Sequence, residues 1–504
     1  MTAIGFSRGD LYYLLPELIV CTGALLLLLA DVALSQQRQA RAAWVAILSL
    51  GAAATLLAVM SASETTIARG TFAVDGFAIF FKLLFVMSAA VTVLLSHRYL
   101  TIEGGRPGEY YFLVLCATAG MMIMASGIDL IVLFIGLETM AVCFYILAGF
   151  LKPNRRSNEA AVKYFLLGAF SLALLLYGMS LLYGLTGSTA LRAIATALAS
   201  GSSGRLLAVA VMLLVAGLGF KIAAAPFHMW APDVYEGAPT PITAFLSVGS
   251  KAAAFAMLLR IFFEGLPAFH LDGLGSVFGQ PLGWASFFYV LSVLSMTIGN
   301  LAALTQTNVK RMLAYSSIAQ AGYMLIGIVA GTPRGVSAAL LYLVVYAFMQ
   351  LGAFGVIVLM RREGVAGDEL RDLAGLSSRQ PAIGIAMLLF MLSLGGIPPT
   401  AGFMGKVWLF ASAIEAGYFG LAVIAVLNSA LSLYYYVRVV VYVWVRREEP
   451  GTPPIVLSRA MIVALAFAAA GTLALGVYPR ILFELAQASA ASLGRAEPML
   501  GWLR

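Results

Sequence analysis

Residues 219–255 read GFKIAAAPFHMWAPDVYEGAPTPITAFLSVGSKAAAF. An apolar run that begins upstream contains Lys221 and stops near Pro226. After a short polar stretch, a second apolar run contains Lys251. Proline removes a backbone donor and clashes with the preceding turn, so the first run predicts an interrupted helix. Long apolar runs that each hold one ionisable residue are typical of transmembrane helices with a functional site.

The composition places the whole chain in the membrane class. Of its 504 residues, 62% are hydrophobic and 11% are charged, which is more apolar surface than a water-soluble domain needs. A helix of about 20 apolar residues spans a bilayer. We therefore predict an all-α membrane protein with about fourteen transmembrane helices. The apolar segments are 11–34, 42–62, 76–97, 109–127, 129–150, 158–186, 206–230, 241–264, 284–304, 312–331, 336–360, 381–415, 418–445 and 456–477.

The twelfth segment, 381–415, is too long for one straight span. Its 35 residues would form a helix of about 52 Å, whereas the hydrocarbon core is ~30 Å thick. Residues 394–406, LGGIPPTAGFMGK, supply the glycines and prolines that predict a break. Breaks in segments seven and twelve suggest an internal repeat with a site at mid-membrane. We divide the chain into 1–108, two five-helix repeats at 109–264 and 284–445, and 456–504.

The basic residues predict the orientation. With the N-terminus outside, fifteen loop residues face inside and four face outside, and basic loops favour the cytoplasmic face. We expect both termini outside, on the periplasmic side. The inside set is Arg38, Arg41, Arg98, Arg106, Lys152, Arg155, Arg156, Lys310, Arg311, Arg361, Arg362, Arg371, Arg379, Arg446 and Arg447, and the outside set is Arg69, Arg192, Arg205 and Arg334.

Ionisable residues inside the apolar segments are the candidate functional groups, because each costs several kcal/mol unless it is paired or hydrated. They are Glu138, Lys163, Lys221, Lys251 and Lys406. The chain has 24 Arg but only 7 Lys, and most of the lysines lie in apolar segments. Arginine keeps its proton, whereas a desolvated lysine can release it. The pattern favours a proton relay, and the alternative is buried ion pairs that only fix helix register.

Other polar residues of these segments are weaker candidates. His228 lies beside the predicted break, where an imidazole can pass protons near neutral pH. Asp233 and Glu236 are expected near a loop, where they could gate access. Lys82 and Glu17 could extend toward the headgroups, as could Arg260 near its helix end. The cysteines, Cys21, Cys116 and Cys143, have no metal-type spacing, so we expect no metal or cofactor in this chain.

The residues singled out above resemble a known family. The stretches 219–255, NVKRMLAYSSIAQAGYMLIG (308–327), GGIPPTAGFMGK (395–406) and GLETMAVCFYILAGF (136–150) are similar to the antiporter-like membrane subunits of respiratory complex I. Within this family, the amino-acid sequence of 219–255 most resembles subunit N of bacterial NADH-quinone oxidoreductase.

The resemblance implies two inverted five-helix repeats with discontinuous helices seven and twelve. It also implies proton translocation driven by electron transfer from NADH to quinone elsewhere in the complex. Glu138, Lys221, Lys251 and Lys406 would form the proton relay, and Lys163 and His228 would be further polar residues of its axis. NADH, FMN, iron–sulfur clusters and quinone would be held by partner subunits. Neighbouring M-like and K-like subunits in a bacterial inner membrane would be the partners.

Two other classes of protein remain open at this point. A subunit of a related cation/proton antiporter or membrane hydrogenase complex would keep the same lysines. A solute permease that works alone would need a cluster of substrate-selective polar groups, and the sequence shows none. A purely structural subunit is the last alternative, and it predicts that replacement of Lys221 leaves pumping intact.

Overall fold

The computed structural model describes residues 8–33, 42–60, 63–200, 204–277, 280–361, 367–447, 455–495 and 497–498. Twelve helices of this part are long and apolar enough to cross a membrane. The remaining two predicted spans are α2 (Leu15–Ala33) and a broken segment made of α17 (Pro381–Gly395) and α18 (Ala401–Glu415). The prediction of an all-α membrane protein is confirmed. Arg38, Arg41 and Arg362 lie outside the described residues.

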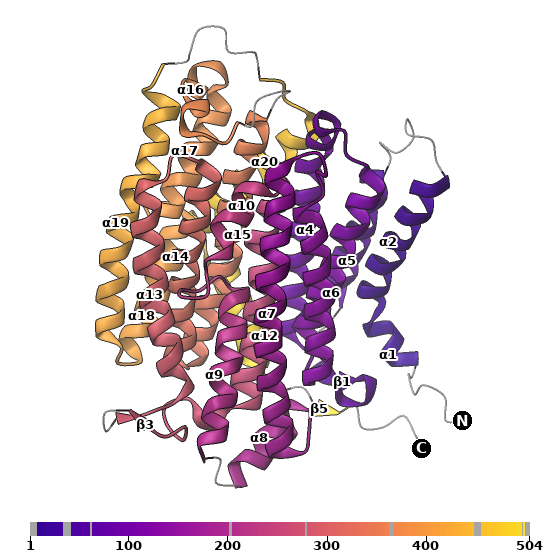
Figure 1. The fold of residues 1–504 in the computed structure, drawn as a ribbon, viewed down its shortest axis with the longest axis vertical. Coiled ribbons are helices and arrows are strands. Elements are labelled where there is room, and N and C mark those ends of the chain that lie inside the picture. Colours follow the sequence, from indigo (N-terminus) through magenta and orange to yellow (C-terminus); the bar gives the residue numbers. More distant parts are fainter. Residues whose placement is uncertain are drawn as a thin grey trace.

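The N-terminal helices form the edge of the bundle (Figure 1). The short helix α1 (Arg8–Tyr13) leads into α2, and α3 (Ala42–Val59) and α4 (Gly76–Glu103) follow. Between α3 and α4, β1 (Thr65–Ile67) pairs antiparallel with β2 (Phe72–Val74), and β5 (Glu497–Pro498) adds to β1 in parallel. Both α1 and β5 therefore lie at one end of the molecule.

Two groups of five segments make up most of the bundle. The first contains α5 (Pro107–Ser126), α6 (Leu130–Ala148), α7 (Arg155–Thr186), the broken segment of α9 (Gly204–Lys221) and α10 (Trp230–Gly237), and segment eight. The second contains α13 (Trp284–Thr305), α14 (Val309–Ala330), α15 (Pro333–Met360), α17 with α18, and α19 (Phe419–Trp444).

The two groups run in opposite directions. Because five crossings is an odd number, the second group starts from the opposite side of the bundle. In Figure 1, α10 lies above α9, whereas α18 lies below α17. Both fourth segments are broken, as predicted, which matches the expected pair of inverted repeats.

Further elements connect and follow these segments. They are α8 (Leu191–Ser200), β3 (Ser276–Val277), β4 (Gln280–Pro281), α16 (Leu376–Arg379), α20 (Arg459–Val477), α21 (Arg480–Ser492) and 3-10 turns at Ala68–Gly70, Pro267–Phe269 and Leu370–Leu373. The segment α20 is the last predicted span. The helices α8 and α21 were not expected from the apolar pattern, because they lie outside the apolar segments.

The break in the twelfth segment follows from its glycines and prolines. Gly396 has φ +83°, a left-handed conformation that ends α17. A Cβ on Gly402, in the first turn of α18, would lie 1.8 Å from the Ser393 carbonyl oxygen, so the two half-helices meet more closely than any larger residue allows. The Gly402 amide donates to Ser393 Oγ at 3.0 Å, which satisfies a backbone group freed by the break.

The break in the seventh segment uses different residues for the same purpose. Ala223, two residues after the end of α9, has φ +57°, which is strained for a residue with a side chain. The Ala225 amide donates to Ser295 Oγ of α13 at 2.8 Å. The Trp230 indole donates to the Phe220 carbonyl at 3.0 Å. Neighbouring side chains therefore supply the hydrogen bonds that the interrupted helix lacks.

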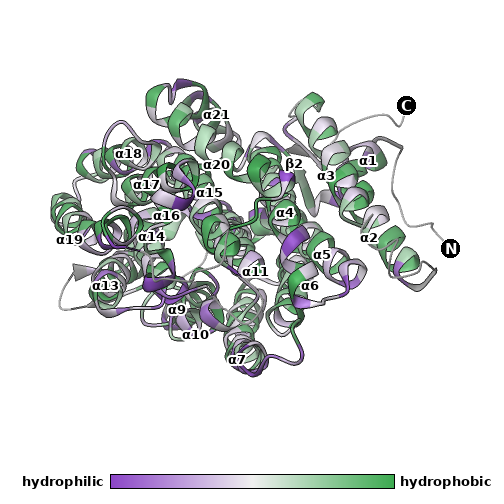
Figure 2. Ribbon diagram, turned by 90° about the horizontal axis from the view of Figure 1, so that it is seen from above, coloured by the Kyte–Doolittle hydropathy of each residue, from purple (hydrophilic) through white to green (hydrophobic). Residues whose placement is uncertain are grey.

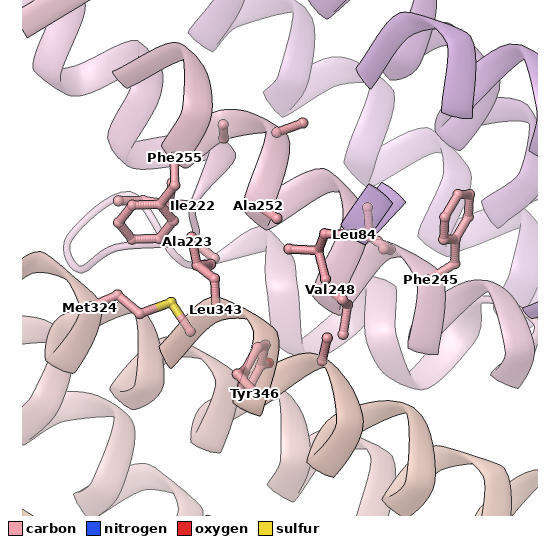
Figure 3. Close-up of a cluster of buried hydrophobic side chains, with 14 of the residues drawn as sticks. Leu84, Ile222, Ala223, Phe245, Val248, Ala252, Phe255, Met324, Leu343 and Tyr346 are labelled. Atoms are coloured by element: carbon pink, nitrogen blue, oxygen red, sulfur yellow. The ribbon is translucent and has the colours of Figure 1, made fainter. Parts of the chain in front are cut away.

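Segment eight is the most buried span of the described chain. It consists of α11 (Thr240–Phe245), the π-helical turn η3 (Leu246–Ser250), α12 (Lys251–Leu259) and a second π-helical turn, η4 (Arg260–Gly265). Figure 3 shows Val248 and Ala252 of this segment beside Leu343 and Tyr346 of α15. Such π-turns are frequent at functional sites, and the first one ends directly before Lys251.

The outer surface of the bundle is apolar. Hydrophobic residues dominate the outward ribbons in Figure 2. On α7, for example, Phe165, Leu166 and Phe170 expose 53%, 60% and 66% of their surfaces. Large apolar side chains in contact with lipid carry no cost, so this surface fits a chain that lies in a bilayer.

Candidate functional site

Lys221 is the last residue of α9 and lies at the start of the first break. Its side chain is buried, with 3% of the residue exposed. The amine Nζ lies 3.4 Å from the Tyr145 hydroxyl and 5.6 Å from the centroid of the Tyr145 ring. A neutral phenol on α6 is therefore the hydrogen-bond partner of this amine.

Glu138 lies on the same helix as Tyr145, seven residues earlier. This spacing places the two side chains on one face of α6, about 10 Å apart along its axis. Glu138 is half-buried, and its carboxylate interacts electrostatically with the Lys221 amine. One of its oxygens, Oε1, is buried and has no hydrogen-bond partner among the described residues. The structure thus brings Glu138 and Lys221 into range without joining them in a direct ion pair.

Lys251 lies at the centre of segment eight, with 2% of the residue exposed. Its amine donates to the Ser317 carbonyl at 2.5 Å and to Ser317 Oγ at 2.7 Å. The Tyr346 hydroxyl donates to the same Ser317 Oγ at 2.8 Å. The Tyr235 hydroxyl of α10 lies 3.4 Å from it. Ser317, on α14, therefore joins the amine to two buried phenols.

Lys406 follows the second break and is 3% exposed. Its amine donates to the carbonyl oxygens of Leu394 and Gly395, both at 3.1 Å, and to Ser429 Oγ at 2.9 Å. The two carbonyls belong to the last turn of α17, where the helix dipole favours a cation. The amine thus occupies the gap between the two half-helices.

A polar network along α14 and α15 extends from Ser317 toward Lys406. Gln320, one turn after Ser317, donates to the Leu394 carbonyl at 3.3 Å, the oxygen that also accepts from Lys406. The Tyr342 hydroxyl donates to Gln320 Oε1 at 2.5 Å. Tyr342 and Tyr346 are one turn apart on α15. Hydrogen bonds and single helical turns therefore connect Lys251 to Lys406.

Lys221, Lys251 and Lys406 form a row of buried amines. Lys163 and His228 lie away from this row. Lys163, on α7, pairs with Asp233 at 2.6 Å and Glu159 at 2.8 Å, and 40% of its side chain is exposed. His228 is half-buried in the first break, and its Nδ1 atom has no hydrogen-bond partner in the described chain. The following residue, Met229, is 77% exposed, so this part of the break reaches the surface of the chain.

The expectation that Arg260, Lys82 and Glu17 reach the headgroups was wrong. Arg260 is fully buried and pairs with Asp75 at 2.8 Å and Glu264 at 2.5 Å. Lys82 pairs with Glu17 at 2.6 Å, and both side chains are less than 10% exposed. In each case an adjacent helix or turn supplies a carboxylate, so the cation is neutralised where it lies.

Sequence reasoning also missed Tyr145, Ser317, Gln320, Tyr342 and Tyr346. Tyrosine and serine are common in transmembrane helices for ordinary reasons, and their spacing shows no functional pattern. The only signal was that Tyr145 belongs to the quoted stretch 136–150, and Ser317 and Gln320 to the quoted stretch 308–327.

The sequence and fold of this chain are similar to those of known proteins. A sequence model of the family described as "NADH:quinone oxidoreductase/Mrp antiporter, TM" matches residues 127–432. The chain belongs to this family. The matched range runs from the start of α6 into α19, so it includes the two broken segments and all four residues of the predicted relay.

Several relatives that match most of the chain are named NADH-quinone oxidoreductase subunit N. The chain is 49% identical over 434 residues to "NADH-quinone oxidoreductase subunit N 2" of Solibacter usitatus, which covers 86% of each chain. It is 44% identical over 486 residues to "NADH-quinone oxidoreductase subunit N" of Trichlorobacter lovleyi, covering 96% of this chain and 97% of that one.

Solved structures of the family share the fold. A chain of respiratory complex I from Thermus thermophilus with bound aureothin is similar with a TM-score of 0.78 at 37% identity, covering 94% of this chain and 99% of that one. A chain of the Mrp complex from Dietzia sp. has a TM-score of 0.80 at 22% identity, covering 96% and 98%. The second likeness shows the fold alone.

Proposed function

We propose that this chain is the proton-translocating subunit N of a bacterial NADH-quinone oxidoreductase. Its family membership and its relatives of 44–49% identity support the assignment. The observation that carries the mechanism is the surroundings of Lys221, Lys251 and Lys406. Each amine is buried, and its hydrogen bonds go to hydroxyl or carbonyl oxygens rather than to a carboxylate.

The absence of direct carboxylate partners at these amines, among the described residues, supports a relay over a set of structural pairs. A buried ion pair holds its proton firmly, because separating the charges leaves one of them uncompensated. An amine with only neutral acceptors can be charged or neutral without breaking such a pair. Arg260 and Lys82 show the structural type in the same chain, since each is paired directly with a carboxylate.

The proposed route starts at Lys221, whose charged form is favoured by the carboxylate of Glu138. When Glu138 is neutralised or moves, the Lys221 proton is less stable and passes to Lys251, with water completing the path. From Lys251 it follows Ser317 and the network along α14 and α15 to Lys406. Lys163 and His228 lie on the path by which protons reach the row of amines, and they are not members of the row.

Electron transfer belongs to other subunits in this proposal. NADH, FMN, iron–sulfur clusters and quinone are held by partner subunits, and the energy arrives here as a change of charge or shape at the boundary with the K-like and M-like neighbours. The chain lies in the bacterial inner membrane with both termini in the periplasm. The clustering of basic residues on one set of loops supports this orientation.

The test is Lys221→Ala in the assembled complex in native membranes. We expect the proton pumping rate to fall at least tenfold and NADH:quinone reductase activity to fall with it, while the amount of assembled complex is unchanged. Lys152→Ala, in the exposed loop before α7, is the control. Wild-type pumping in Lys221→Ala would overturn the proposal.

The second candidate is a subunit of a cation/proton antiporter or membrane hydrogenase complex. The same row of lysines would serve it, and no contact in the structure favours it over the first. Proton pumping that depends on sodium rather than on quinone reduction would support it.

A further inference from the structure

A cluster of six charged side chains lies above Lys221 and is not part of the amine row. It joins α7, α10 and α14, and it surrounds a cavity of about 180 Å³, which is room for several water molecules. Its members are Arg156, Glu159, Lys163, Asp233, Glu236 and Arg311. Three cations and three carboxylates face one another, so the cluster is electrically balanced.

Asp233 is the centre of the cluster. One of its oxygens accepts from Lys163 Nζ at 2.6 Å, and the other accepts from Arg311 Nη1 at 2.7 Å. Arg311 also donates to Glu236 Oε2 at 3.0 Å. Asp233 and Glu236 lie on α10, the second half of the broken segment, whereas Arg311 lies on α14 of the other repeat. The ion pairs therefore fasten one repeat to the other across the break.

The cluster lies at the end of the bundle that meets water. Arg156, in the first turn of α7, has 64% of its side chain exposed, whereas Glu236 has 25% and Asp233 has 31%. Exposure thus decreases from the rim of the cavity toward α10. The loop before α7 carries Lys152, so this is the basic end of the molecule.

An aromatic layer separates the cavity from Lys221. Trp230, one turn before Asp233, stacks on Tyr164 with ring centroids 4.6 Å apart, and Tyr164 follows Lys163 directly. Trp230 also stacks on Phe220, the neighbour of Lys221, at 5.3 Å. Tyr164 and Trp230 are 1% and 3% exposed. Tyr164 and Phe220 are each adjacent in sequence to a charged residue, and Trp230 lies one turn before another.

We propose that this cluster is the closed aqueous mouth of the path to Lys221, and that the Asp233–Arg311 ion pair is its latch. The inference rests on the proposed proton-translocating function. When α10 and α14 separate, Asp233 loses Arg311, the inner end of the cavity opens to water, and Trp230 moves with α10 away from Tyr164. The mouth then opens toward Lys221, and closing the latch isolates the amine from the aqueous phase.

The test measures access to the cavity, not pumping. Ala160 of α7 lines the cavity and is 2% exposed. Ala160→Cys is introduced into a chain in which Cys21, Cys116 and Cys143 are replaced by serine, within the complete complex. Resting inside-out membrane vesicles are treated with a membrane-impermeant maleimide. We expect slow labelling with the native latch and labelling at least fivefold faster in Arg311→Gln and in Asp233→Asn.

Two controls separate the latch from ordinary loss of an ion pair. Arg311→Lys keeps the charge and should label as slowly as the native chain. Arg334→Gln breaks a half-exposed ion pair with Glu415 that borders no part of this cavity, and it should have no effect. Equal labelling rates in Arg311→Gln, Asp233→Asn and the native chain would overturn the latch.

The labelling test of the latch and the pumping test of the proposed function can fail separately. Fast labelling with the native latch, at the rate of Lys152→Cys in the exposed loop, would overturn the closed mouth. If labelling responds to the latch but Lys221→Ala pumps normally, the mouth exists and the proposed relay fails. Labelling from the other face, in right-side-out vesicles only, would contradict the assigned direction of the path.

Discussion

At the scale of single residues, the contrast between two kinds of buried cation is the main finding. Arg260 and Lys82 have carboxylate partners within 3 Å. Lys221, Lys251 and Lys406 have hydroxyl and carbonyl oxygens instead. The first kind stabilises the bundle, because removal of either partner leaves an uncompensated charge. In the proposed relay the second kind changes its charge, and no direct ion pair has to break for that change.

Tyr145→Phe tests whether the phenol beside Lys221 has a role in the relay. The ring and its packing remain, but the hydroxyl 3.4 Å from the amine is lost. A hydrogen bond to a charged group contributes about 1.5 kcal/mol, so we expect proton pumping to fall about tenfold with normal assembly. Tyr177→Phe is the control, because Tyr177 is 58% exposed on α7. Unchanged pumping in Tyr145→Phe would remove the phenol from the route.

At the scale of elements, the two broken helices are interrupted by a left-handed backbone conformation at different residue types. Gly396 ends α17 in a left-handed conformation that suits glycine, whereas Ala223 adopts a similar conformation after α9 at a cost. In both breaks a lysine lies at or near the free end of the first half-helix. Strain held at such a place is typical of functional segments.

Gly402→Ala should disrupt the second break. The added methyl group would lie 1.8 Å from a backbone oxygen of α17, which cannot move aside without shifting the half-helix. We expect a loss of about 3 kcal/mol of stability, measured as a lower temperature of thermal inactivation of the detergent-solubilised complex. Gly184→Ala in α7 has open space around it and should leave that temperature unchanged or slightly raised. Equal behaviour of the two variants would show that the half-helices separate easily.

At the scale of the whole molecule, α14 contacts three of the polar regions. Its first turn carries Arg311, which holds α10. Two turns on, Ser317 holds Lys251, and Gln320 reaches the carbonyl shared with Lys406. One rigid helix therefore touches the mouth, the middle amine and the last amine. A movement of α14 would change all three places together.

The buried triad of Arg260, Asp75 and Glu264 fastens the N-terminal helices to segment eight. Arg260 also donates to the Ala125 carbonyl at the end of α5. Arg260→Met leaves two carboxylates without their cation, which costs about 3–5 kcal/mol, so we expect little assembled subunit in membranes by immunoblot. Arg106→Gln, which breaks an exposed pair with Glu109, should cost less than about 1 kcal/mol. Normal levels of the Arg260→Met subunit would show that the triad is dispensable.

The sequence alone was sufficient to predict the membrane spans and the helix breaks. It was not sufficient to predict which residues pair with the buried charges. Apolar runs give the spans, and Pro398 and Gly396 give the second break, because these signals are local. The pairing of Arg260 with Asp75 joins residues 185 positions apart, and no local pattern encodes it. The two π-helical turns of segment eight also have no signal in composition. The role of Glu138, Lys221, Lys251 and Lys406 in proton transfer stays a prediction.

The setting of Lys406 has a consequence for how the last amine could be controlled. Its charge is balanced by two backbone carbonyls at the end of α17, and backbone dipoles, unlike carboxylates, cannot be switched off by taking up a proton. The balance changes when α17 and α18 move relative to each other. This amine would then respond to mechanical displacement of two half-helices, whereas Lys221, near Glu138, responds to the charge of a neighbour.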